Sequence, residues 1–203
     1  DDGADLVIDR GYIAAGIRGR AEALATLELG PRSELDMQSA LAREVDADGR
    51  RPFEDTADCR EVGDKLCLLM FDIDHFKNFN DVNGHELGNV ALVGVASLCM
   101  ENSRQAGDRV PDLVARYGGE EFMIPLRGVP LKRAEEVAER IRQAVETKHF
   151  PGGENQPTGK VTISIGVAAF PDHSDNGDEL INSADEALYE AKRGGRNRVC
   201  VAQ

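Results

Sequence analysis

Positive charge is in short supply in this sequence. The 203 residues include 24 Lys and Arg against 37 Asp and Glu, which gives a formal net charge of −13. Binding along the phosphate backbone of DNA or RNA needs clustered Lys and Arg, so this balance argues against nucleic acid as a partner. A small phosphorylated ligand is not excluded, because metal ions, backbone N–H groups and a few local cations can hold one.

Paired metal-binding cysteines and long apolar runs are missing too. The four cysteines are scattered, with no CxxC pair and no histidine at the spacing of a zinc site. No apolar run approaches the roughly 20 residues of a membrane span. The acidic N-terminus DDGADLVIDRG does not resemble a signal peptide. We therefore expect reduced thiols, no membrane span, and a cytoplasmic protein or the cytoplasmic part of a larger sensor.

The chain does have enough apolar material for one ordinary domain with an extension, since 41% of its residues are hydrophobic. Helical spacing over residues 11–28 and 33–45 precedes a polar stretch at 46–64 that is typical of a loop. We predict an N-terminal helical extension or linker over residues 1–45 and a domain over residues 46–203, with its core beginning near residue 65.

The pattern after residue 64 predicts a sheet covered by helices. Residues 65–74 (KLCLLMFDID) form a nearly continuous apolar run, typical of a strand buried on both faces. Residues 112–126 predict two strands joined by a tight turn at Gly118 and Gly119. The other segments predict helices over 75–84, 85–104, 131–148 and 178–195 and strands over 160–170 and 199–202. This order indicates a mixed sheet of the α+β or α/β class.

The first buried strand ends in two carboxylates, in the segment FDID at residues 71–74. A carboxylate at the end of a buried strand is costly to desolvate unless a cation neutralises it. Asp72 is therefore a candidate ligand for Mg²⁺ or Mn²⁺. An Asp at a strand-to-helix junction can also cap the following helix, and this segment alone leaves both interpretations open.

A second pair of carboxylates, Glu120 and Glu121, follows two glycines in the segment GGEEF. The glycines let the backbone approach a ligand closely, and a divalent cation would relieve the repulsion between the two side chains. The alternative is an exposed acidic hairpin tip. Carboxylates on neighbouring strands also hold the two metal ions of palm-type polymerases, which carry out in-line phosphoryl displacement.

Two cations stand near the end of the last predicted helix. In AKRGGRN, residues 191–197, Lys192 and Arg196 lie four positions apart. Cations are favoured at a helix C-terminus by the helix dipole, so a structural role is as reasonable as phosphate binding.

Taken together, these segments resemble the GGDEF family of diguanylate cyclases from about Lys65 to the C-terminus, some two thirds of the chain. A lone GGEEF would be weak support, but five blocks stand in the family's order and spacing. They are FDIDHFKNFND at 71–81, GHELGN at 84–89, RVPDLVARYGGEEF at 109–122, SIGVA at 164–168 and ADEALYEAKRGGRN at 184–197. The resemblance implies a palm-like, mostly antiparallel mixed sheet flanked by helices.

The resemblance also implies a reaction. Two GTP molecules would be condensed into cyclic di-GMP with release of two pyrophosphates, each 3′-hydroxyl attacking the α-phosphate of the other nucleotide. Each subunit of a homodimer would hold one GTP and two Mg²⁺ or Mn²⁺ ions, under the control of an upstream sensory domain. Positioning and charge neutralisation would supply most of the acceleration.

Site residues follow from the matching positions. Asp72, Glu120 and Glu121 would act in catalysis and coordinate the metal ions, with help from the carbonyl of Ile73. Glu120 would also assist deprotonation of the 3′-hydroxyl. The substrate would be bound at guanine by Asn80 and the residue at position 89, and at the terminal phosphates by the backbone N–H groups of His75, Phe76 and Lys77 and the side chains of Lys192 and Arg196.

An RxxD motif made by Arg109 and Asp112 stands five residues before Gly118, which is the spacing of the family's product-inhibition site. Arg can stack on guanine and bind phosphate in a fork, while Asp can accept from guanine N–H groups. The resemblance therefore implies inhibition by bound cyclic di-GMP. A salt bridge within a loop is the alternative.

The sequence departs from the family pattern in two places. Asn89 stands where the family usually has Asp; because an amide both donates and accepts, the site could also admit adenine and make cyclic GMP-AMP. Residues 26–37 do not match the family's usual DxLTGLxNRRxF-like segment, which puts the coupling to upstream signals in question.

Two functions of other classes compete with the cyclase. One is a non-catalytic receptor that binds cyclic di-GMP through Arg109 and Asp112. Such degenerate domains usually lose the GGEEF carboxylates, and this chain keeps them. The other is a structural dimerisation module, which would explain the helices but not the clustered carboxylates and cations.

Overall fold

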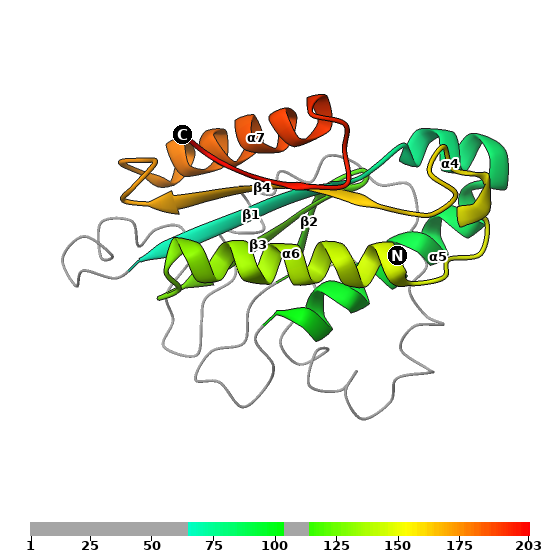
Figure 1. Cartoon of the computed structure of the whole chain (residues 1–203), viewed down its shortest axis with the longest axis horizontal. Coiled ribbons are helices and arrows are strands. Elements are labelled where there is room, and N and C mark those ends of the chain that lie inside the picture. The colour runs from blue at the N-terminus through cyan, green and yellow to red at the C-terminus, as the bar shows by residue number, and fades with distance from the viewer. Residues whose placement is uncertain (1–64, 104–113) are drawn as a thin grey trace, which may run out of the picture.

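The computed structural model describes residues 65–103 and 114–203 (Figure 1). The predicted helices over 11–28 and 33–45 and the predicted loop over 46–64 lie outside the described residues. So do Arg109 and Asp112 of the RxxD motif. None of the helices in the described ranges combines the length and the apolar composition that crossing a bilayer requires.

A five-stranded sheet forms the centre of the described part. Its strands are β1 (Leu66–Ile73), β2 (Ala115–Gly118), β3 (Glu121–Arg127), β4 (Ile163–Phe170) and β5 (Val199–Val201). They lie in the order β2-β3-β1-β4-β5. Only the β4–β5 pair is parallel. The predicted mixed, mostly antiparallel sheet is confirmed.

Within residues 65–103 and 114–203, four helices surround the sheet, each where the sequence pattern predicts one. They are α4 (Phe76–Asn83), α5 (His85–Asn102), α6 (Leu131–Thr147) and α7 (Gly177–Arg193). Helix α7 lies on one face, with α5 and α6 on the other (Figure 1). A short 3₁₀ helix, η1 (Gly153–Asn155), was not predicted. It follows Gly152, which has a positive φ of 84°. Three residues are too few to show a helical periodicity in the sequence.

The central strand β1 is buried along its whole length, as its apolar run predicts. Cys67, Leu69 and Phe71 belong to the core under α5 and α6, while Leu66 and Leu68 pack in the second core under α7. This alternation follows from the period of two in a strand, and both faces need apolar residues because both are covered. Polar side chains at the end of β1 are thus held by a rigid element.

Helix α7 lies very close to β4, and a single glycine permits this. A Cβ atom built on Gly166 would stand 2.1 Å from the carbonyl oxygen of Ala184 and 2.3 Å from the amide nitrogen of Leu188. Because both neighbours are helix backbone, no side-chain rotation can make room. The close approach sets where the last turn of α7, which carries Lys192, meets the end of β1.

Chains with Gly166→Ala should therefore be destabilised by roughly 2–3 kcal/mol, because the added methyl group forces α7 away from β4. Urea unfolding followed by circular dichroism measures the change. Gly118→Ala is the matched control, since no atom lies within 4 Å of its added Cβ; it should change stability by less than about 0.5 kcal/mol. Equal effects of the two substitutions would contradict the packing argument.

Candidate active site

The predicted carboxylates meet at one end of the sheet. Asp72 on β1 lies directly opposite Glu121 on β3 in the antiparallel register. The neighbouring Ile73 N–H donates to the carbonyl of Glu120 at 3.3 Å. Glu120 belongs to the turn between β2 and β3, and Gly119 in that turn has a φ of 49°. The FDID and GGEEF segments, far apart in sequence, therefore form one acidic cluster.

Burial makes this cluster electrostatically unfavourable on its own. Asp72 is only 9% exposed. Loss of solvent raises the pKa of its carboxyl to about 6, and repulsion from Glu120 and Glu121 acts in the same direction, against the attraction of Lys192. Burial also raises the pKa of Glu121. Such a group of carboxylates has an unmet demand for positive charge.

Lys192 partly meets this demand. Its Nζ lies 2.9 Å from Oδ2 of Asp72, from the last turn of α7. Two of the alternatives left open by the sequence are not seen here. Helix α4 begins after His75 and has no side-chain cap hydrogen bond, so Asp72 does not cap it. Glu120 and Glu121 are half-buried, so the turn is not a fully exposed acidic tip.

Arg196 lies just beyond the end of α7, near the helix C-terminus as expected. Helix α7 ends at Arg193, so Lys192 and Arg196 do not lie on successive turns of one helix. The chain turns back through Gly194 and Gly195, the N–H of Arg196 donates to the carbonyl of Ala191, and Arg196 has a φ of 65°. The two glycines allow this reversal, which leaves the Arg196 side chain exposed.

The predicted phosphate-binding backbone lies where β1 passes into α4. His75 has a left-handed φ of 57°, and helix α4 starts at Phe76. His75 and Lys77 are exposed, whereas Phe76 is buried and stacks on Phe79. The first N–H groups of a helix have no partner within it and suit an anion. This turn directly follows the strand that carries Asp72.

Asn80 holds an unsatisfied acceptor inside the fold. Its Oδ1 is buried and has no hydrogen-bond partner among the described residues. A Cβ atom on Gly88 of α5 would lie 1.8 Å from that oxygen, so only glycine leaves space there. Asn89 follows Gly88 and is half-buried. The close packing at Gly88 was not predicted, although a glycine inside an otherwise helical pattern can signal such packing.

The donor set fits a divalent cation that has further ligands. The described residues contain no group of three His, Cys, Asp or Glu side chains arranged to hold a metal. Asp72, the Glu120–Glu121 pair and the backbone oxygen of Ile73 are hard oxygen donors of the kind that Mg²⁺ takes, in sites where substrate phosphates and water complete the coordination. The raised pKa of Asp72 and its contact with Lys192 show that a cation is favoured there.

Comparison with known protein families decides the membership. A family model described as diguanylate cyclase, GGDEF domain, matches residues 53–198. This chain belongs to the GGDEF family. The five sequence blocks thus mark true membership, and the sheet with its flanking helices is the GGDEF fold.

Three relatives illustrate the likeness. Diguanylate cyclase A of Treponema denticola is 41% identical over 143 residues, which cover 70% of this chain but only 37% of that relative. The GGDEF domain of DgcB from Caulobacter crescentus, solved in complex with c-di-GMP, is 36% identical, with a TM-score of 0.60 over 73% of this chain and 84% of that one. The active GGEEF domain of a diguanylate cyclase from Vibrio cholerae is 29% identical, with a TM-score of 0.65 over 75% and 92%.

The electrostatics of this GGDEF site predict that Asp72→Asn leaves stability at about pH 7 unchanged or raises it by about 1 kcal/mol. The folded pKa of about 6 lies above the usual 3.8. Ionised Asp72 therefore costs the wild type stability above pH 6, and this cost vanishes below about pH 4. Urea unfolding of both proteins at these two pH values measures it. A variant less stable than the wild type by more than about 1 kcal/mol at pH 7 would mean that the Lys192 contact outweighs burial.

Proposed function

We propose that this GGDEF domain is a diguanylate cyclase, which condenses two GTP molecules into cyclic di-GMP and two pyrophosphates. The observation that supports this most directly is the meeting of Asp72 and Glu121 across β1 and β3, with Lys192 on Asp72. Asp72 is buried and Glu121 is half-buried, and both carboxyls have a raised pKa. Such a pair, beside a helix start and nearby cations, suits a metal-dependent reaction at phosphorus.

Asp72, Glu120 and Glu121, with the carbonyl of Ile73, would hold two Mg²⁺ or Mn²⁺ ions. When bound, such ions neutralise charge on the phosphates and favour ionisation of the attacking hydroxyl. The protein contributes a fixed frame: Asp72 and Ile73 belong to a strand that is buried along its whole length, and the hydrogen bond from the Ile73 N–H to the Glu120 carbonyl holds the turn against it. Glu120 would assist removal of the 3′-hydroxyl proton.

The substrate's phosphates would lie at the start of α4, and its base would lie near the middle of the helix, beside Asn80. Backbone N–H groups of His75, Phe76 and Lys77 would bind the terminal phosphates, together with Lys192 and Arg196. Asn80, whose buried Oδ1 lacks a partner in the described part of the chain, would accept from the guanine N–H groups beside Asn89. An unsatisfied buried acceptor next to a glycine supports a ligand that supplies a donor.

The remaining parts of the proposal concern partners. Each subunit would bind one GTP, so that two must meet as a homodimer for the reaction. Cyclic di-GMP would inhibit through Arg109 and Asp112, a hypothesis supported by their spacing before Gly118. Three further points stay predictions: an upstream sensory domain, a cytoplasmic location, and the division into a helical extension over residues 1–45 and a GGDEF domain over residues 46–203.

If Glu120 acts in catalysis, Glu120→Gln should lower cyclic di-GMP synthesis by at least roughly 100-fold while leaving the fold intact, because the amide keeps the shape but not the charge. Purified protein is incubated with GTP and Mg²⁺ or Mn²⁺, and products are identified by mass spectrometry. Glu136→Gln, on the exposed face of α6, is the control and should keep wild-type activity. Synthesis retained by Glu120→Gln would remove Glu120 from the mechanism.

Base selection is tested at position 89. An amide in place of a carboxylate can pair with either purine, so GTP and ATP supplied together should yield some cyclic GMP-AMP beside cyclic di-GMP. Asn89→Asp should reduce the mixed product about tenfold, because an ionised carboxylate accepts only and favours the N–H groups of guanine. Mass spectrometry measures the product ratio. Exclusive cyclic di-GMP from the wild-type protein would dismiss relaxed base choice.

A further inference from the structure

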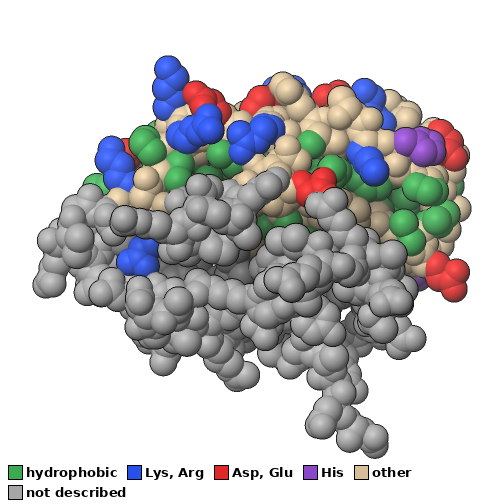
Figure 2. Space-filling view, turned by 90° about the horizontal axis from the view of Figure 1, so that it is seen from below, with side chains coloured by type: hydrophobic (Ala, Val, Ile, Leu, Met, Phe, Trp, Pro, Cys, Tyr) green, Lys and Arg blue, Asp and Glu red, His purple; other side chains and the backbone are tan. Residues whose placement is uncertain are grey.

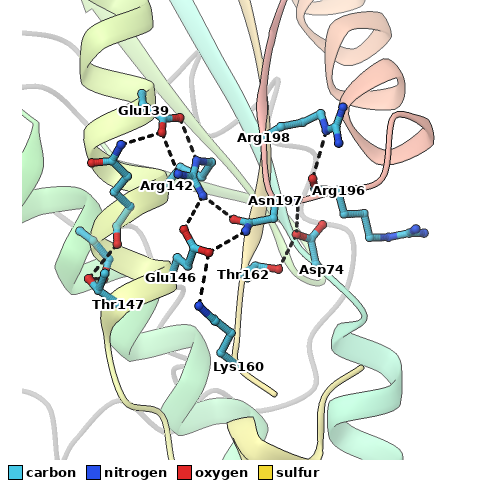
Figure 3. Close-up of polar contacts among 12 residues, drawn as sticks. Asp74, Glu139, Arg142, Glu146, Thr147, Lys160, Thr162, Arg196, Asn197 and Arg198 are labelled. Carbon is cyan, nitrogen blue, oxygen red and sulfur yellow. Dashed lines mark hydrogen bonds and ion pairs between the residues drawn. The ribbon is translucent and has the colours of Figure 1, made fainter. Parts of the chain in front are cut away.

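Asp74 is a buried carboxylate to which the cyclase chemistry assigns no role. It is 3% exposed and lies two residues after Asp72 and directly before His75. Figure 3 shows how its oxygens are held: Oδ2 accepts from Thr162 Oγ1 at 2.7 Å and from the N–H of Asn197 at 3.0 Å. Its Oδ1 accepts from Ser164 Oγ at 2.6 Å, and its own N–H donates to the Thr162 carbonyl. Three donors therefore fix the Asp74 side chain: Ser164 in β4, Thr162 just before β4, and Asn197 just before β5.

Asn197, the backbone donor in this group, belongs to the turn that carries Arg196. Both residues have left-handed φ angles, 46° for Asn197 and 65° for Arg196. Such a conformation is unfavourable for residues with side chains unless surrounding contacts hold it. The Asn197 side chain supplies them, since its Oδ1 accepts from Arg142 Nη1 at 2.6 Å and its Nδ2 donates to Glu146 Oε1 at 3.0 Å.

The anchor for this side chain is an ion-pair cluster on α6. Arg142 has an 11% exposed side chain and binds Glu139 at 2.7 Å and Glu146 at 2.8 Å. The hydrogen bonds from Arg142 and Asn197 hold the pKa of Glu146 down to about 2, so this carboxylate stays charged at neutral pH. Because the planar guanidinium is held by Glu139 and Glu146, its Nη1 donates to Asn197 in a fixed direction.

The hydrogen bond from Asn197 to Asp74 joins two segments that are 123 residues apart. One is the turn at His75 that starts α4, and the other is the turn at Arg196 that follows α7. Both would contact the terminal phosphates under the proposed function. Among the hydrogen bonds of the described residues, the one from the Asn197 N–H to Asp74 links these two turns through a buried side chain.

We propose that Asp74 and Asn197 are positioning residues, which set the helix start at His75 and the cation Arg196 at a fixed distance for the β- and γ-phosphates of the nucleotide. This inference rests on the proposed function. Neither side chain would contact the substrate. Asp74 would act through the backbone of His75, which follows it, and Asn197 would act through the side chain of Arg196, which precedes it. Loss of the link should therefore weaken recognition of the phosphates beyond the first, and leave recognition of the base and α-phosphate unchanged.

Asn197→Gly tests this link, because glycine accepts the left-handed φ while the contacts to Arg142 and Glu146 are lost. Affinities of the whole chain with Mg²⁺ are measured by calorimetry for GMP, GDP and a GTP analogue with a methylene group between the α- and β-phosphates, which cannot release pyrophosphate. The variant should lose about tenfold in affinity for the triphosphate and less than about twofold for GMP. A merely structural role would lower all three alike.

A matched pair on α6 separates the link from general stability. Glu146 and Glu139 each accept from Arg142, but only Glu146 also accepts from Asn197. Glu146→Ala should therefore reproduce the selective loss for the triphosphate, whereas Glu139→Ala should bind all three nucleotides like the wild type. Thermal unfolding of each variant verifies that it is folded. An equal effect of the two substitutions would overturn the positioning role.

The two proposals fail separately. Cyclic di-GMP synthesis by the wild type, with the same affinities in wild type and Asn197→Gly, would overturn the positioning role and leave the cyclase. Selective loss for the triphosphate in the variant, without synthesis by the wild type, would support positioning in a domain that only binds nucleotide. A wild-type chain that binds neither GMP nor the triphosphate analogue would overturn both.

Discussion

The active end of this domain depends on one partly buried ion pair, between Asp72 and Lys192. Asp72 is carried by a strand that is buried along its whole length, so its position is rigid and its charge is poorly solvated. Lys192 reaches it from the last turn of α7, a helix that lies close to β4 at Gly166. The packing of apolar residues in the core therefore fixes the distance between the acidic cluster and its cation. A poorly solvated carboxylate lowers the stability of the folded protein, and such carboxylates are typical of catalytic and ligand-binding sites.

The surface outside this end has a different character. Figure 2 shows basic and acidic side chains interspersed over the described part of the face seen from below, rather than gathered into one continuous basic surface. Ion pairs on α6 such as Arg133 with Glu136 are exposed and contribute little to stability. Charged side chains are held in fixed positions at Asp72, which is buried, and around Arg142, which belongs to an ion-pair network.

Much of this fold could be predicted from local sequence patterns. The apolar run of β1, the two glycines of the β2–β3 turn and the helical spacing of α6 each specify one element without help from the rest of the chain. The GGEEF and FDID carboxylates could also be paired, because family resemblance supplies the contact that periodicity does not. The end of α7 was also predicted, since the helix expected over 178–195 stops at the glycines, Gly194 and Gly195, before Arg196.

What the sequence could not show are contacts that depend on tertiary structure. Nothing in the pattern of residues 191–197 indicates that Asn197 donates to Asp74, and nothing around Gly88 indicates the buried oxygen of Asn80. Both depend on how separate elements approach, which is decided by the whole core. The structural roles of Asp74, Gly88 and Asn197 could therefore be read only from the folded chain.

Helix α4 carries two of the proposed substrate contacts at a fixed spacing. The start of the helix would bind the terminal phosphates, and Asn80, four residues after Phe76, would bind the base. A rise of about 1.5 Å per residue separates these two points by about 6 Å along the axis. Under the proposed function, the backbone geometry of this helix sets the spacing between these two contacts, while the turn at Arg196 and Asn197 would reach the phosphates from a separate segment of the chain.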